Sequence, residues 1–227
     1  MDNFSRREFM FFSALLPLLI PLPARALVIE KKYQKIVYPN TLLVLKQAFK
    51  CEIIAHKHYI KYVEKAMAEK YPNIAYMFHT FSVSEKIHAD NYQRIIKNLG
   101  SAMNDTRMVI DVRDTKTNLI AATKNELEKI EITYPEFLEK IETEECEDAI
   151  INCMYSWKSH HQHEAKIKTI QKYSGSFFGS VAKKIEGVPL DFHVCEICGS
   201  TIDEEPDSPC AICNKSLSHY RKIKRPE

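Results

Sequence analysis

Residues 78–89 read FHTFSVSEKIHA, and this stretch decides the fold. Apolar residues recur here three and four positions apart, which is the spacing of one face of a helix. The same pattern extends over residues 72–99, and its apolar stripe also includes Glu85 and His88. An unpaired carboxylate is costly to bury, so a Glu and a His on a core stripe predict buried partners for both.

Three more segments, residues 40–70, 116–143 and 145–172, show the same helical spacing. Four amphipathic helices predict a mainly α fold, a four-helix bundle. The chain has only five glycines, which argues against a β-rich fold with many tight turns. We expect Pro135 to kink the third helix.

Each of the four helices places at least one Glu or His on its apolar stripe. These residues are Glu52, His56, Glu85, His88, Glu126, His160 and His163. Inward Glu and His side chains from facing helices are what a carboxylate-bridged metal site requires. Any one of these residues alone could instead lie at the edge of the core, where it forms a salt bridge or reaches solvent and binds no metal. His56 fits a packing or supporting role better than a ligand role.

A second metal site is predicted near the C-terminus by two Cys-x-x-Cys hooks separated by eleven residues. The four cysteines are Cys195, Cys198, Cys210 and Cys213. This spacing is typical of four thiolates around one metal ion, with two disulfides as the alternative. Gly199 and Asn214 follow the hooks, where a positive φ lets backbone N–H groups point at sulfur. Spacing alone does not separate iron from zinc.

The N-terminus carries the features of an export signal. Residues 5–10 read SRREFM, an apolar run follows over residues 9–23, and Ala24-Arg25-Ala26 supplies a cleavage site. The paired arginines resemble the twin-arginine signal, so we expect residues 1–26 to be removed and the protein to be periplasmic. An ordinary secretory signal is the alternative. A membrane anchor is disfavoured because the run is shorter than the roughly 20 residues that span a bilayer.

Several of these motifs together resemble the rubrerythrin family. They are FKCE at residues 49–52 followed by Tyr59, SEKIHA at 84–89, Glu126 eight residues before YPEF at 134–137, and His163-Glu164. The resemblance covers the mature chain. It implies a ferritin-like four-helix bundle over residues 27–173, a Ser- and Gly-rich linker over 174–190 and a rubredoxin-like domain over 191–227.

The resemblance also implies chemistry: a non-haem iron protein that reduces hydrogen peroxide, with dioxygen as an alternative oxidant. Electrons would come from an external donor through one iron at the four cysteines. The bundle would hold one or two metal ions, expected to be iron, on Glu52, Glu85, His88, Glu126, His160 and His163. Tyr59 and Tyr134 would hydrogen-bond to the ligand carboxylates. We expect the two sites to lie far apart within one chain, and therefore a head-to-tail homodimer.

Two positions depart from the family pattern: His160 stands where a Glu is usual, and Lys129 stands where a further Glu is usual. Fewer carboxylates neutralise less metal charge, which leaves open a modified di-iron centre, a single-metal centre or another metal such as zinc or copper. A non-catalytic electron-transfer or metal-binding protein, or a structural zinc protein, is therefore an alternative to the enzyme. The formal net charge of +2 gives no indication of a nucleic-acid partner.

Overall fold

A computed structural model describes residues 38–103, 109–172, 186–187 and 189–227. The predicted signal peptide and most of the predicted linker lie outside the described residues. Within these ranges no helix is both long enough and apolar enough to cross a membrane.

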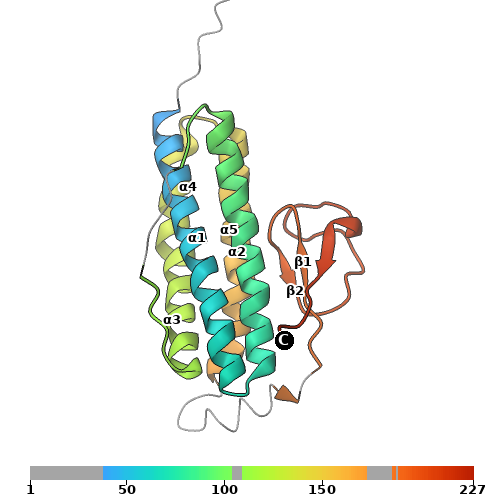
Figure 1. Cartoon of the computed structure of the whole chain (residues 1–227). Helices are drawn as coiled ribbons and strands as arrows, with labels where there is room; N and C mark the ends of the chain where they lie inside the picture. Colours follow the sequence, from blue (N-terminus) through green and yellow to red (C-terminus); the bar gives the residue numbers. More distant parts are fainter. Residues whose placement is uncertain (1–37, 104–108, 173–185, 188) are drawn as a thin grey trace, which may run out of the picture. The chain divides into compact units, whose positions relative to one another are not determined.

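Long helices dominate the fold, as predicted (Figure 1). They are α1 (Pro39–Ala68), α2 (Pro72–Asn98), α3 (Thr115–Glu128), α4 (Tyr134–Glu142) and α5 (Glu147–Lys172). Both α1 and α2 begin with proline, which suits a first helical turn because its missing N–H has no partner there anyway. The predicted mainly α, ferritin-like bundle is confirmed.

The third predicted helix is interrupted rather than kinked at its proline. A π-helical turn, η1 (Lys129–Thr133), separates α3 from α4, and Pro135 lies in the first turn of α4. The indole Nε1 of Trp157 donates a hydrogen bond of 2.9 Å to the carbonyl oxygen of Ile130 in this turn. Turns of this kind are frequent at functional sites. Here the turn carries the buried Lys129.

The buried stripe of α1 lies one position before the predicted one over most of its length. The spacing predicts Ile60 in the core, but this residue is 39% exposed, whereas Tyr59 and Tyr62 are buried. Successive turns of α1 still bury positions three or four residues apart, so the helical spacing is as predicted and only the face that is covered differs. His56 is half-buried, and its Nδ1 lies 2.7 Å from the carbonyl oxygen of Ser82.

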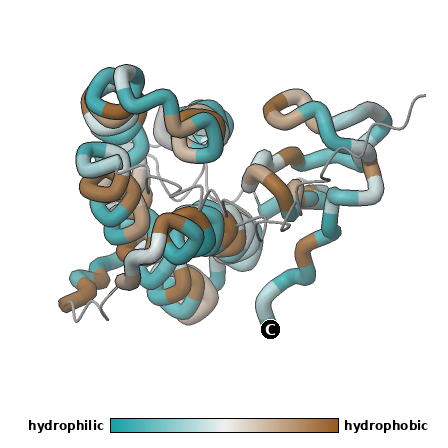
Figure 2. The backbone as a smooth tube through the Cα atoms, turned by 90° about the horizontal axis from the view of Figure 1, so that it is seen from above, coloured by the Kyte–Doolittle hydropathy of each residue, from teal (hydrophilic) through white to brown (hydrophobic). Residues whose placement is uncertain are grey.

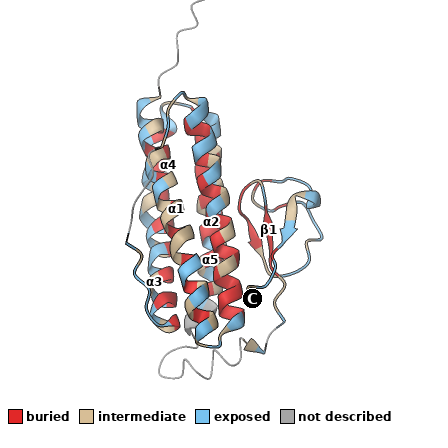
Figure 3. Ribbon diagram, in the orientation of Figure 1, coloured by how far each residue is buried: buried red, intermediate tan, exposed pale blue. Residues whose placement is uncertain are grey.

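Two apolar clusters lie on either side of the Glu and His positions along the bundle. One includes Tyr62, Phe78 and Phe81, and the other includes Leu45 and Tyr92. Viewed end-on, the helices carry both hydrophobic and hydrophilic residues (Figure 2), and buried residues run along α1, α2 and α5 (Figure 3). The polar layer is therefore enclosed by core on both sides.

The C-terminal part is a small three-stranded antiparallel sheet of order β2-β1-β3. Its strands are β1 (His193–Cys195), β2 (Thr201–Ile202) and β3 (Tyr220–Lys222), with a 3-10 turn, η2 (Leu217–His219), before β3. Cys195 pairs with Tyr220 across the sheet. Gly199 and Asn214 have φ of 78° and 55°, which confirms the positive φ predicted after each hook.

Candidate metal centres

The bundle brings together all six residues predicted as ligands. They are Glu52 from α1, Glu85 and His88 from α2, Glu126 from α3, and His160 and His163 from α5. Each is at most 1% exposed. They form two overlapping sets of four, both containing Glu85 and His160, in which the ligand atoms lie within 4.8 Å of one another. The arrangement is that of a buried metal site shared by four helices.

Lys129 is part of this cluster. Its Nζ lies 2.8 Å from Glu52 Oε2 and 3.5 Å from Glu85 Oε1. Burial by itself lowers the pKa of Lys129, but the carboxylates of Glu52, Glu85 and Glu126 outweigh this effect and raise it above its usual value. Lys129 therefore carries its positive charge inside the bundle.

Two tyrosines donate hydrogen bonds to the ligand carboxylates, as the resemblance implied. Tyr59 Oη donates to Glu126 Oε1 over 2.5 Å, and Tyr134 Oη donates to Glu52 Oε1. Burial and the neighbouring carboxylates raise the pKa of both tyrosines well above the usual value. Both hydroxyls consequently stay protonated and act as donors that orient the carboxylates.

His160 lies between two carboxylates. Its Nδ1 is 2.8 Å from Glu126 Oε2, and its Nε2 is 3.2 Å from Glu52 Oε1. Burial and Lys129 lower the pKa of His160, but the carboxylates outweigh both and raise it to about 10. Without a metal, His160 is thus a cation at neutral pH, and a metal ion would have to displace one of its protons.

Two buried polar atoms show that the cluster suits a cation. Glu85 Oε1 and His163 Nδ1 lie 3.4 Å apart, and neither makes a hydrogen bond within the described ranges. His163 Nε2 lies 3.3 Å from Thr201 Oγ1, whose hydroxyl donates to Gly199 O. The threonine oxygen then accepts from Nε2–H, which leaves a lone pair on Nδ1 facing the carboxylate.

His88 is held in the same way. Its Nε2 lies 3.1 Å from the carbonyl oxygen of Cys198, which can only accept, so Nε2 carries the hydrogen. Its Nδ1 lies 3.1 Å from Glu85 Oε2. Two histidine lone pairs directed at carboxylate oxygens are a donor set for a metal ion such as iron, so the residues fit the predicted cofactor.

The four cysteines form the second centre. Cys195 Sγ lies 3.7 Å from Cys213 Sγ, and Cys198 Sγ lies 3.5 Å from Cys210 Sγ. A tetrahedral metal ion with metal–sulfur distances of about 2.3 Å separates its sulfurs by about 3.8 Å, whereas a disulfide bond is about 2.05 Å long. The neighbouring Cys195 and Cys210 thiols and burial raise the pKa of Cys198, so a cation is needed to hold it as a thiolate. The spacing fits one metal ion and not two disulfides.

The loop after the first hook contacts the bundle directly. Ser84 Oγ and Ser159 Oγ donate to Gly199 O over 2.7 and 3.0 Å, and Asn91 Nδ2 donates to Ile197 O over 2.8 Å. A Cβ on Gly199 would lie 2.3 Å from His88 Nε2. The expectation that the two sites lie far apart within one chain is therefore wrong for this structure, because His88 contacts both. The sequence predicted a positive φ at Gly199 but did not indicate that this residue packs so closely against His88.

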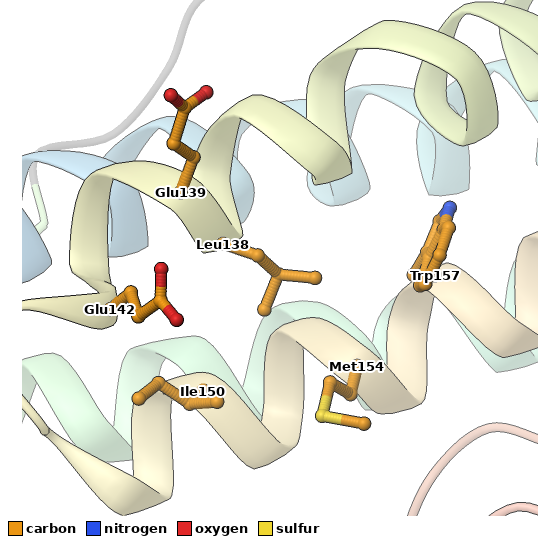
Figure 4. A pocket seen from close by; sticks show the side chains of 6 residues that line it. All are labelled: Leu138, Glu139, Glu142, Ile150, Met154 and Trp157. Atoms are coloured by element: carbon orange, nitrogen blue, oxygen red, sulfur yellow. The ribbon is translucent and has the colours of Figure 1, made fainter.

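A small pocket of about 210 Å³ lies on the outer side of Lys129. Its lining includes Cys51, His58, Glu128 and Lys129. The Lys129 side chain both lines this pocket and contacts the carboxylates of Glu52 and Glu85, so it separates the pocket from the cluster. A second pocket of about 300 Å³ lies between α4 and α5 (Figure 4), and no residue of the metal cluster lines it.

The sequence model of the family described as Rubrerythrin matches residues 44–170. The chain belongs to the rubrerythrin family. It is 28% identical over 182 residues to Rubrerythrin-2 of Clostridium acetobutylicum, covering 78% of this chain and 93% of that protein. It is 34% identical over 107 residues to Rubrerythrin-1 of the same organism, covering 44% and 53%.

Solved structures agree on the rubrerythrin fold. Fully reduced, all-ferrous nigerythrin has a TM-score of 0.69 at 20% identity, covering 92% of this chain and all of that one. A Desulfovibrio desulfuricans bacterioferritin with a di-iron site has a TM-score of 0.59 at 19% identity, covering 66% and 88%. The rubrerythrin family binds iron, and this member has a four-cysteine cluster and bundle Glu and His groups suited to metal.

Proposed function

We propose that this rubrerythrin reduces hydrogen peroxide at the bundle, with electrons that enter through the four-cysteine centre. The observation that carries the proposal is the position of His88, whose Nε2 lies 3.1 Å from Cys198 O and whose Nδ1 lies 3.1 Å from Glu85 Oε2. Cys198 belongs to the four-cysteine domain at the C-terminus, which we call the knuckle. One imidazole ring thus joins the backbone of Cys198 to the carboxylate of Glu85. Such a short bonded path suits electron transfer between the two centres.

The overall reaction is H₂O₂ + 2 e⁻ + 2 H⁺ → 2 H₂O. Iron bound in the two centres would supply the two electrons by going from ferrous to ferric, and an external reductant would restore them. The pocket beside Lys129 is large enough for a small oxidant, and the Lys129 side chain lies between this pocket and the carboxylate of Glu52. The apolar clusters on both sides of the cluster exclude bulk water and larger molecules.

The test is anaerobic mixing of the fully reduced, iron-loaded protein with peroxide, followed by absorbance. We expect rapid oxidation of the four-cysteine iron in the unchanged protein and slow oxidation in His88→Gln. Asn91→Ala is the matched control, because it also removes a contact between bundle and knuckle but leaves His88 in place. If peroxide oxidises the unchanged protein no faster than a chain without bundle metal, the proposal fails.

A non-catalytic electron-transfer or metal-binding role is the second candidate. The ion pair between Lys129 and Glu52 favours it, because a cation already neutralises part of the bundle site. This role predicts a reducible four-cysteine iron with no peroxide effect beyond background in the same experiment.

Export and assembly are proposals from the sequence. Periplasmic localisation is tested by cell fractionation, with Arg6→Lys/Arg7→Lys expected to retain the protein in the cytoplasm if the twin-arginine route is used. The head-to-tail homodimer is tested by sedimentation of the mature protein. Contact between the two centres within one chain removes the distance argument for a dimer, so the proposal rests on the family resemblance alone.

A further inference from the structure

Glu52 has little capacity left for a metal ion. Its Oε2 accepts from Lys129 Nζ at 2.8 Å, and its Oε1 accepts from Tyr134 Oη. The same Oε1 lies 3.2 Å from His160 Nε2, a third donor. These three hydrogen bonds occupy three of the roughly four lone-pair sites of the carboxylate, and the one that remains is on Oε2, beside the Lys129 ammonium, which would repel a metal ion there.

The charges of the cluster also favour one divalent ion over two. With the histidines neutral, as ligands must be, the three carboxylates contribute −3 and the Lys129 ammonium contributes +1, which leaves −2. One divalent ion brings the cluster to zero, and two bring it to +2. Excess charge in a fully buried site is strongly unfavourable, and every residue counted here is at most 7% exposed.

The atoms best placed to coordinate a metal ion lie in the other half of the cluster. Glu85 Oε1 and His163 Nδ1 have no hydrogen-bond partner within the described part of the chain and lie 3.4 Å apart. Glu126 Oε2 lies 3.8 Å from His163 Nδ1 and 2.8 Å from His160 Nδ1. These four residues form one of the two candidate ligand sets, whose atoms all lie within 4.8 Å of one another.

We infer that the bundle holds a single metal ion on Glu85, Glu126, His160 and His163, and that the Lys129 ammonium takes the place of a second ion between Glu52 and Glu85. The bundle site is then mononuclear, and the Lys129 ammonium supplies the second positive group that a metal ion would supply in a two-metal site. This inference does not rest on peroxide reduction, since it concerns only how many ions bind and where.

The test is native mass spectrometry of the mature full-length protein, stripped of metal and reloaded with excess ferrous iron without oxygen. We expect two ions per chain, one in the knuckle and one in the bundle. After oxidation, the bundle ion should give the electron paramagnetic resonance signal of an isolated high-spin ferric ion, distinct from that of iron bound by four thiolates. Three ions per chain would overturn the inference, and so would one.

Lys129→Glu restores a carboxylate and removes the ammonium, and we expect it to bind three ions per chain, with the bundle signal lost through coupling between two ferric ions. Lys124→Glu makes the same charge change at an exposed position of α3 and should stay at two. A Lys129→Glu protein that still binds two ions would show that Lys129 does not exclude the second. Failure of peroxide reduction would leave all these counts unchanged, so the two proposals fail separately.

Discussion

Replacing Gly199 by alanine should detach the knuckle loop from the bundle. Gly199 has φ of 78°, and a Cβ there would lie 2.3 Å from His88 Nε2 and 2.9 Å from Ser84 Oγ. Real Cβ contacts are not that short, so the loop or His88 must move. The movement would break the bonds from His88 Nε2 to Cys198 O and from Ser84 and Ser159 to Gly199 O.

Three contributions set the magnitude of the effect. Positive φ costs alanine about 1–2 kcal/mol, and reduced freedom of the unfolded chain returns about 0.4–1 kcal/mol. Loss of three hydrogen bonds at about 1 kcal/mol each adds about 3 kcal/mol, so the total is about 3–5 kcal/mol. Gly100→Ala is a matched control, because Gly100 also has positive φ (75°) but is exposed, so only the first two contributions apply, with a net cost of about 1 kcal/mol.

Hydrogen exchange of the metal-loaded proteins measures the difference. The amides of Cys195 and Gly199, which bond to Ser200 O and Cys195 O, report on opening of the loop. A difference of about 3 kcal/mol makes them exchange about 100-fold faster in Gly199→Ala than in Gly100→Ala. Equal exchange in the two variants would refute the close packing of Gly199 against His88.

Three other substitutions give distinct results. Glu144→Ala removes the carboxylate that accepts from the N–H groups of Asn40 and Thr41 at 2.9 and 2.8 Å, and should lower the free energy of unfolding by about 1 kcal/mol, measured in urea. Burial raises the pKa of Glu144 but these bonds outweigh it and lower the pKa, so the difference from the unchanged protein should be present above about pH 4.3 and fade as the pH falls below it. Tyr59→Phe leaves Glu126 Oε1 without its donor and should weaken metal binding in the bundle by about 10–100-fold in a competition titration. Cys198→Ser should lose the knuckle metal and make residues 191–227 sensitive to protease, since a four-thiolate metal stabilises so small a fold.

Each of these has a control in the same chain. Glu142→Ala removes an exposed carboxylate near Glu144, Tyr62→Phe removes a hydroxyl from a tyrosine packed against Tyr59, and Cys51→Ser changes a half-buried thiol outside the knuckle. Effects equal to those of the controls would contradict, in turn, the helix cap, the role of Tyr59 as donor and the four-cysteine centre.

Local patterns in the sequence were enough to predict the bundle. The stripes on each helix placed Glu85 and His88 inward because helical periodicity depends only on neighbouring residues. The π turn at Lys129–Thr133 could not be predicted in this way, because helical periodicity does not distinguish one π turn from α-helix, and its contact with Trp157 comes from another helix. Spacing also places Ile60 on the apolar stripe of α1, but spacing alone does not determine which of two adjacent faces the neighbouring helices cover.

Contacts between distant parts of the chain explain the rest. Lys129 was recognised as a departure from the family pattern, but its ion pair with Glu52, 77 positions away, required the fold. Thr201 showed no signal at all, because an ordinary threonine in a short strand becomes important only when His163 lies 3.3 Å from it. Such roles depend on packing between distant parts of the chain, so the spacing of residues in the sequence does not predict them.

The loop formed by residues 198–201 has a consequence for how the protein matures. It holds the ring hydrogens of His88 and His163 away from the bundle, so the bundle ligands are in the right tautomer only when this loop is ordered. Metal in the knuckle should order the loop and thereby tighten metal binding in the bundle. Thermodynamic linkage requires the reverse effect to be equal, which paired titrations can measure. Because this linkage depends on backbone order and not on redox chemistry, zinc in the knuckle would serve it as well as iron. A cell that misloads zinc would then make a correctly folded protein, with a complete bundle, that no donor can reduce through its knuckle.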